Sequence, residues 1–179
     1  MPDFLRVHQD FDLDNERISI ISTGSSDNIT YLYVMFNEFH IPCYIIFDGD
    51  KPNISLDKLT GKEKDDAKNK SRRNKELLEF IGEQADEDGD FFFPETSVKE
   101  KYAVWGKNFE DVFHMTLENY EEIKEGAYKL YGTKSKPLTG RYFAEELTSK
   151  FPEKISPYVD NLIEKIKGCC WKESCLGKG

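Results

Sequence analysis

The segment Ile41–Lys51, which reads IPCYIIFDGDK, constrains the fold of this chain more than any other stretch. Cys43 to Phe47 is an uninterrupted apolar run, the pattern expected of a strand that is buried on both faces of a parallel sheet. The run ends in Asp48 and Asp50, two carboxylates separated by one glycine. In open α/β sheets, ligands bind beyond the carboxyl ends of the strands, so these two side chains are candidates for a binding site.

Two interpretations of this Asp-Gly-Asp sequence are open. Carboxylate oxygens at such a place are hard ligands, which suit Mg²⁺ or Mn²⁺. The same three residues also suit a plain polar turn, because aspartate and glycine are common in turns. The spacing alone does not separate a metal site from a turn.

The composition limits the classes of function. A chain of 179 residues is long enough for one well-packed core, so one domain with appendages is expected. The formal net charge of −9 argues against a protein that coats nucleic acid through bulk positive charge, although it leaves room for local basic patches. The sequence has neither an apolar run that could span a bilayer nor the core of a signal peptide. These features predict a cytoplasmic protein without a membrane partner.

The first half of the sequence has the strand–helix–strand order of a parallel α/β fold. Ile18–Ile21 is a short β-branched run that predicts a strand, and residues 28–39 carry apolar side chains at helical spacing. The buried strand after Pro42 completes the unit, whose crossover is right-handed in nearly all known proteins. Upstream, Pro2 to Gln9 would be the end of an earlier helix.

Residues 53–75 are polar and highly charged, with seven Lys or Arg and three Asp or Glu between Lys62 and Lys75. This composition is typical of a solvated loop, here leading into a helix at 74–82. The alternative is an arm that contacts nucleic acid phosphates beside the two carboxylates. The candidate phosphate contacts in this arm are Lys70, Arg72 and Arg73.

The second half is expected to be mostly helical. Phe91–Phe93 and Tyr102–Trp105 predict two further strands, or one strand and a covered loop. An apolar stripe at helical spacing predicts one long helix from Phe109 to Tyr131. Two more helices are predicted at 138–150 and 157–167.

These elements define the predicted organisation of the chain. Residues 1–107 form the α/β core, residues 108–168 form a helical carboxy-terminal part of the same domain, and residues 169–179 form a flexible tail. Three of the four cysteines lie in this tail, without the spacing or the fourth ligand that a structural zinc site needs.

Four segments of the sequence occur in the order found in one family of nucleases. They are Ile18–Asp27, Ile41–Lys51, Asn108–Asp111 and Ser135–Pro137. Together they resemble the carboxy-terminal Toprim domain of the OLD (overcoming lysogenization defect) family, and the likeness covers most of the chain. The Asp-x-Asp after an apolar strand resembles the general Toprim signature, whereas the Phe-Glu pair and the Ser-Lys-Pro sequence resemble the OLD group in particular.

The resemblance implies a fold and a chemistry. The expected fold is α/β, a Toprim (Rossmann-like) parallel sheet flanked by helices, and the expected activity is DNA cleavage with two bound Mg²⁺ or Mn²⁺ ions. Asp48 and Asp50 would be catalytic, and together with Glu110 they would hold the metal ions. Lys136 would stabilise negative charge on the leaving phosphate. The implied partners are DNA, an ABC-type ATPase domain or subunit, and a second copy in a homodimer, and the implied role is phage defence.

Each of these assignments has a plainer alternative. Glu110 lies where an acidic residue in the first turn of a helix would compensate the helix dipole. Lys136 lies in a basic loop in which an exposed lysine is ordinary, and Lys134 is the neighbouring candidate for the same role or for a DNA contact. A small phosphatase-like hydrolase, with the Asp-x-Asp as nucleophile and acid, is a third class, but it leaves the Phe-Glu and Ser-Lys-Pro sequences unexplained.

The sequence also departs from the family pattern. A Toprim domain opens with a strand that ends in Glu-Gly-x-x-Glu, and this sequence contains no such motif. It contains no Gly-x-x-x-x-Gly-Lys-Ser/Thr loop of an ATPase either. We therefore expect Met1 to be the start of a truncated gene, a split subunit or a cut-down protein, with weak or no cutting unless another segment or chain supplies the glutamate. A noncatalytic Toprim remnant that binds DNA or a partner ATPase is the alternative.

Overall fold

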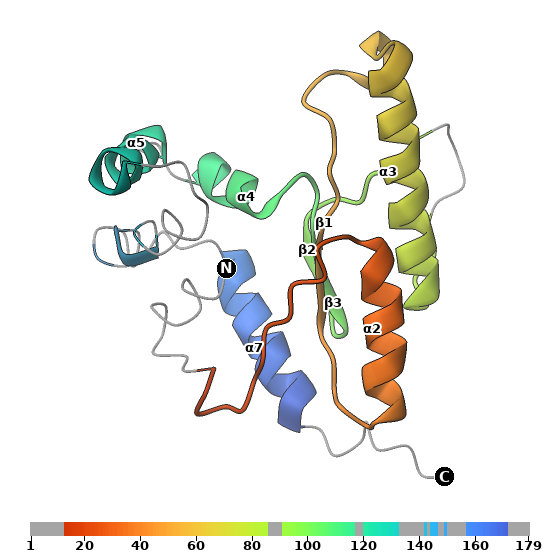
Figure 1. The fold of residues 1–179 in the computed structure, drawn as a ribbon, viewed down its shortest axis with the longest axis vertical. Helices are drawn as coiled ribbons and strands as arrows, with labels where there is room; N and C mark the ends of the chain where they lie inside the picture. The colour runs from red at the N-terminus through yellow and green to blue at the C-terminus, as the bar shows by residue number, and fades with distance from the viewer. Residues whose placement is uncertain are drawn as a thin grey trace. The chain divides into compact units, whose positions relative to one another are not determined.

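The computed structural model describes the backbone of residues 13–85, 91–116, 120–132, 142, 144–146, 149 and 157–171, and the side chains of all of these except 113–116 and 170–171. The chain divides into two compact units, whose helices and strands are shown in Figure 1. One unit comprises Met1–Ile21 and Phe109–Glu164. The other comprises Ser22–Asn108 and Lys165–Gly179.

A three-stranded sheet organises the unit that contains Ser22–Asn108. Its strands are β1 (Ile45–Asp48), β3 (Tyr102–Trp105) and β2 (Ser97–Val98), in that spatial order. β1 and β3 are parallel, with Ile45 opposite Tyr102 and Asp48 opposite Trp105, and β2 is antiparallel to β3. The parallel pair and the helices around it confirm the predicted α/β class.

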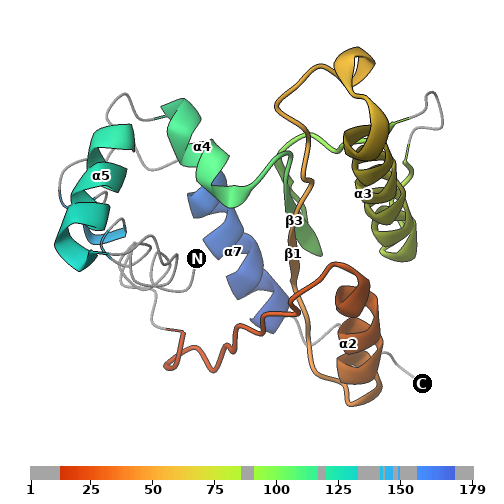
Figure 2. The ribbon, with the colours of Figure 1, turned by 45° about the horizontal axis from the view of Figure 1, so that its top comes forward.

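The core of this unit lies between one face of the sheet and the helices α2 (Asp27–Glu38) and α3 (Gly61–Phe80). Both views place the two helices on the same side of the sheet (Figures 1 and 2). Alternate residues of each strand face this core, because side chains along a strand point to opposite faces. The buried members of the core are Ile29, Ile45, Phe47, Leu77, Leu78, Tyr102 and Val104. The order β1, α3, β3 is thus one parallel strand–helix–strand unit.

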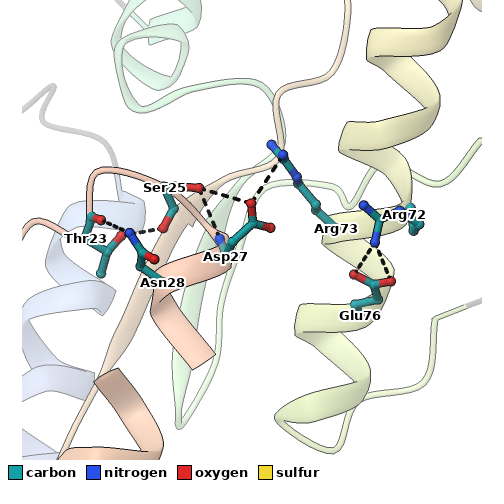
Figure 3. A network of polar contacts seen from close by, with 7 residues as sticks. All are labelled: Thr23, Ser25, Asp27, Asn28, Arg72, Arg73 and Glu76. Carbon is teal, nitrogen blue, oxygen red and sulfur yellow. Dashed lines mark hydrogen bonds and ion pairs between the residues drawn. The ribbon is translucent and has the colours of Figure 1, made fainter. Parts of the chain in front are cut away.

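A loop of short polar residues fixes the start of α2 (Figure 3). The Thr23 hydroxyl donates to the Ser25 carbonyl at 2.8 Å, and the Asn28 amide donates to the Thr23 carbonyl at 2.9 Å. The Ser25 hydroxyl accepts the backbone N–H of Asp27 at 3.3 Å, so it satisfies one of the free donors at the helix start. The observed helix confirms the prediction for residues 28–39 to within one residue at each end.

The prediction of a strand at Ile18–Ile21 was wrong, because no strand forms there in the described residues. The backbone N–H of Ile18 donates to the carbonyl of Leu13 at 2.8 Å and closes a turn. Ile20 and Ile21 follow with 40% and 53% of their surface exposed. β-Branched residues favour extended backbone, but a strand also needs a neighbour that completes its hydrogen bonds. Composition reports only the first of these requirements.

The charged stretch 53–75, which the sequence predicts as a solvated loop, is largely helical, so this prediction was also wrong. A 3-10 turn, η1 (Leu56–Lys58), comes first, and α3 begins at Gly61. The buried residues in the first part of α3 are Ala67, Ser71 and Asn74. They have helical spacing but are small or polar, so no apolar stripe reveals the helix. The many Lys, Arg and Glu residues have good intrinsic helix propensity, which favours the observed structure.

The segment Phe91–Phe93 is a covered loop, and Tyr102–Trp105 is the fully buried strand β3. Of the two alternatives that the sequence leaves open, one strand and a covered loop is confirmed. Phe92 packs against the core, and its backbone N–H donates to the hydroxyl of Ser71 at 2.6 Å. This hydrogen bond attaches the loop to helix α3.

In the other unit, the regular secondary structure of the described residues is helical. The structure gives two helices, α4 (Phe109–Thr116) and α5 (Tyr120–Tyr131), where the sequence predicts a single one, and residues 117–119 lie outside the described part. Apolar spacing continues across both helices, so periodicity could not reveal the division. Gly132 follows α5 with a φ of 61°, and its N–H donates to the carbonyl of Tyr128 at 3.0 Å. This is the left-handed ending that favours glycine after a helix.

Helix α7 (Pro157–Trp171) begins in this unit and ends in the other. It extends beyond the predicted 157–167 into the segment predicted as a tail, and residues 172–179 lie outside the described part. The predicted helix at 2–9 and most of the one at 138–150 also lie outside it. No helix in the described residues is long and apolar enough to cross a membrane.

Candidate functional site

The carboxyl end of β1 continues into a turn whose backbone is hydrogen-bonded to the last residue of β3 and to the two residues that follow it. We call residues 48–50 the Asp-Gly-Asp turn. The N–H of Gly49 donates to the carbonyl of Trp105 at 2.6 Å, and the N–H of Asp50 donates to that of Lys107 at 2.9 Å. The N–H of Lys51 donates to the carbonyl of Gly106 at 3.2 Å. Three consecutive backbone donors are therefore satisfied by backbone carbonyls.

The residues of this turn suit its geometry. A Cβ added at Gly49 would lie 2.6 Å from the carbonyl oxygen of Gly106 and 3.1 Å from that of Trp105, so a larger residue does not fit without a backbone shift. Asp50 has a φ of 57°, in the left-handed region that Asp and Asn tolerate better than most residues. The N–H groups of the Asp-Gly-Asp sequence and of Lys51 continue the pairing with the end of β3, so the sequence presents its carboxylates in a defined backbone geometry.

Helix α3 supplies a buried side chain that holds this turn from the other side. The Asn74 amide nitrogen donates to the carbonyl of Gly49 at 2.7 Å, and Asn74 is only 5% exposed. Sequence reasoning missed this residue, because an asparagine in a charged stretch resembles a solvated one. Its spacing from Ala67 and Ser71, on one face of a helix, is the signal that could have identified it.

Both carboxylates of the turn lie at the surface, and one of them faces a cation. Asp48 and Asp50 are exposed, and the ammonium of Lys70 lies 3.7 Å from Asp50 Oδ1. The Lys70 and Asp50 side chains are 43% and 53% exposed. Next along the chain, Lys51 pairs with Glu95 at 3.1 Å. The edge of the sheet therefore carries two exposed carboxylates with basic side chains beside them.

Arg73, one helical turn after Lys70 in α3, pairs with the start of α2. Arg73 Nη2 lies 3.3 Å from Asp27 Oδ2, so the ion pair joins α3 to α2 (Figure 3). The Nε of Arg73 is buried and has no hydrogen-bond partner. Arg72 points elsewhere and binds both oxygens of Glu76, at 2.7 and 2.8 Å, within α3. All three predicted DNA contacts in α3 are thus engaged in ion pairs.

The remaining predicted site residues lie in the other compact unit or outside the described part of the chain. Glu110 lies in the first turn of α4, in the other compact unit, and its role as a metal ligand stays a prediction. There its negative charge acts together with burial, the larger cause, to raise the pKa of Tyr120 to about 12. Lys134 and Lys136 lie outside the described residues.

Two cysteines meet away from the turn. Cys169 Sγ, in α7, lies 3.8 Å from the carbonyl oxygen of Cys43, and burial raises the pKa of the Cys43 thiol. The neighbouring Tyr44 hydroxyl lies 2.8 Å from the carbonyl oxygens of Lys99 and Tyr102. These contacts attach the start of β1 to the sheet and to α7, which is a structural role. Cys175 lies outside the described residues.

The donor set of the turn fits a weakly held, hydrated cation. The described residues contain no group of three or more His, Cys, Asp or Glu side chains that could hold a metal ion. Mg²⁺, however, is usually bound through one or two carboxylates, several waters and the phosphates of a substrate. The Lys70 ammonium beside Asp50 also shows that this carboxylate has room for a positively charged group next to it. Two carboxylates on a fixed turn therefore match what the protein normally contributes to such an ion.

One protein family matches the part of the chain that contains this turn. Residues 1–50 match the family described as overcoming lysogenization defect protein-like, TOPRIM domain. This segment is similar to an OLD-like Toprim domain. The match includes α2 and β1 and ends at Asp50, so both carboxylates lie within the matched segment. No curated protein and no solved structure matches the chain.

Proposed function

We propose that this chain is the metal-binding, nuclease-type part of an OLD-like Toprim protein, and that its reaction is hydrolysis of a DNA phosphodiester bond. The observation that carries the proposal is the pair Asp48 and Asp50. They occupy a backbone-fixed turn at the carboxyl end of a parallel strand, where α/β folds bind ligands. The same turn lies in the segment that matches the OLD-like Toprim family.

In this proposal, the chain contributes binding and orientation. Asp48 and Asp50 would hold Mg²⁺ or Mn²⁺, which supplies Lewis-acid stabilisation of charge at the phosphoryl group when it is bound. Asn74 and the β3 backbone keep the two carboxylates in place. Lys70 and Arg73 place positive charge on the same flank of α3, where it favours the approach of a phosphate.

The remaining assignments of the nuclease proposal come from the sequence. Glu110 would be a further metal ligand, and Lys136 would stabilise charge on the leaving group, with Lys134 as its alternative or as a DNA contact. A fourth carboxylate, the glutamate that this sequence lacks, would come from another segment or chain and complete a site for two ions. DNA, an ABC-type ATPase domain or subunit, and a second copy of the chain would be the partners.

A noncatalytic binding module is the second candidate. It is favoured by the small number of carboxylates at the turn, since two-metal sites usually use more than two. It is also favoured by the exposed basic side chains of α3, because Lys64 and Lys68 add to the positive charge near the paired Lys70. In this form, the protein would bind DNA or a partner ATPase through the same edge without cutting.

Metal titration and plasmid cleavage with the whole chain test the proposal. Mn²⁺ binding, followed by calorimetry, should be weak in the unaltered protein and lost in Asp50→Asn, which keeps the left-handed backbone but removes the charge. Asp65→Asn, an exposed carboxylate on α3, is the matched control and should bind Mn²⁺ unchanged. Equal Mn²⁺ affinity in all three proteins would overturn the metal site.

Cleavage separates the two candidates. Slow, Mn²⁺-dependent nicking of supercoiled plasmid that disappears in Asp50→Asn supports the nuclease. Retained DNA binding and Asp50-dependent metal binding, with no nicking in either Mg²⁺ or Mn²⁺, supports the binding module.

A further inference from the structure

The ion pair between Lys70 and Asp50 joins a basic residue of α3 to a carboxylate of the Asp-Gly-Asp turn. Lys70, Arg73 and Asn74 share one flank of the helix because residues three and four positions apart lie on the same side. Asn74 is bound to Gly49 at 2.7 Å, and this buried contact holds the flank against the turn. The backbone of α3 at Lys70 is therefore kept close to Asp50, while the lysine side chain remains free to change its direction.

The Lys70–Asp50 contact has the properties of an exchangeable pair. The separation of 3.7 Å lies near the outer limit for an ion pair, and both side chains are about half exposed. Exposed pairs of this kind contribute little stability, since solvent screens the charges and the long side chain loses freedom. A divalent cation at the same carboxylate would attract Asp50 more strongly and would repel the ammonium.

The two arginine ion pairs of α3 are not exchangeable with a cation at the turn. Arg73 pairs with Asp27 at the start of α2, and Arg72 is bound through two hydrogen bonds to Glu76. Neither of their partners belongs to the Asp-Gly-Asp turn, so a cation at the turn does not compete with these arginines directly. Of Lys70, Arg72 and Arg73, it is Lys70 that forms an ion pair with a proposed metal ligand, Asp50.

We propose that Lys70 is a displaceable cation that couples metal binding at Asp50 to phosphate binding. Without a divalent ion, its ammonium partly neutralises Asp50. When the ion binds, the ammonium is released and becomes available to a phosphate oxygen of the nucleic acid backbone. This inference rests on the proposed metal site, and it adds a regulation of that site: phosphate affinity depends on whether the ion is present. By linkage, phosphate must raise the affinity for the ion by the same factor.

The first test is Mn²⁺ affinity in the absence of nucleic acid. Lys70→Met keeps much of the apolar side chain and removes the charge, so it should raise Mn²⁺ affinity by about two- to fivefold, the range expected for one exposed charge interaction. Lys68→Met removes an exposed charge from the same helix and should change the affinity less than twofold. Asp50-dependent binding with equal affinity in the Lys70→Met and unaltered proteins overturns this inference and leaves the proposed function intact. If neither the unaltered protein nor any variant shows Mn²⁺ binding that depends on Asp50, both this inference and the proposed function are overturned.

The second test measures affinity for a short DNA duplex by fluorescence anisotropy, with and without Mn²⁺. The unaltered protein should bind the duplex more tightly with Mn²⁺, and Lys70→Met should lose at least half of that increase although it binds Mn²⁺ more tightly. Opposite effects on the two affinities are what displacement requires, because a purely structural defect would weaken both. An increase with Mn²⁺ that is the same in both proteins contradicts the coupling.

Discussion

The hydrogen bond from Asn74 to the Gly49 carbonyl gives a quantitative test of how the Asp-Gly-Asp turn is held. Asn74→Ala removes a donor 2.7 Å from a carbonyl in a site where the asparagine is 5% exposed. Leaving a buried polar group without its partner costs about 1–3 kcal/mol. Alanine recovers roughly 0.5 kcal/mol of that through its higher helix propensity. We therefore expect the free energy of unfolding to fall by about 1.5 kcal/mol.

Urea unfolding, followed by circular dichroism, measures this change. With an m-value on the order of 2 kcal/mol/M, the midpoint should fall by about 0.7 M. Asn69→Ala is the matched control, since Asn69 is an exposed asparagine of the same helix, and it should leave stability unchanged or raise it by a few tenths of a kcal/mol.

A second substitution separates the hydrogen bond from packing. Asn74→Asp keeps the size of the side chain but places a carboxylate oxygen against the Gly49 carbonyl oxygen, so it should destabilise the protein at least as much as alanine does. If Asn74→Ala and Asn74→Asp both unfold within 0.5 kcal/mol of the Asn69→Ala control, about the uncertainty of such comparisons, the turn does not depend on Asn74.

Two further predictions concern backbone space and ionisation. Gly49→Ala should destabilise the protein by about 1–3 kcal/mol, because its Cβ would lie 2.6 Å from a carbonyl oxygen. Gly168→Ala in α7 is the control, since its Cβ would meet nothing within 4 Å, and it should be neutral or stabilising. Equal denaturation midpoints for the two variants would contradict this prediction. The raised pKa of Tyr120, about 12, adds stability that is present below pH 10 and is lost as the pH rises to 12. Tyr120→Phe should therefore lose less stability over that interval, by up to about 2 kcal/mol, and identical pH slopes would refute the assignment.

The sequence predicts those parts of the structure in which apolar residues set the pattern. Residues 28–39 and the strand that ends at Asp48 follow from apolar spacing, because burial of apolar side chains determines both elements. The pair of carboxylates at the strand end follows from the same reasoning. These predictions rest on the burial of apolar side chains, which can be inferred from their spacing along the sequence.

The parts that the sequence does not predict depend on contacts between polar or distant groups. α3 buries Ala67, Ser71 and Asn74, and such residues carry no sign of burial in a charged stretch. Ile18–Ile21 has the composition of a strand, but pairing depends on a neighbour that local composition does not specify. The ion pair of Lys70 with Asp50 joins residues twenty positions apart, and only the path of the chain places them together.

The attachment of the Asp-Gly-Asp turn to the backbone after β3 has a consequence for divergence among related sequences. Its three supporting donors meet carbonyl groups, which every amino acid carries, so these hydrogen bonds do not by themselves fix the side chain at position 107. Position 105 is constrained by burial, since Trp105 is 1% exposed, and position 106 by space, since an added Cβ would lie 3.0 Å from the carbonyl oxygen of Pro94. Position 49 must remain glycine for lack of space, and position 50 must remain a residue that accepts a left-handed backbone. We therefore expect relatives of this chain to keep short signatures at the ends of both β1 and β3.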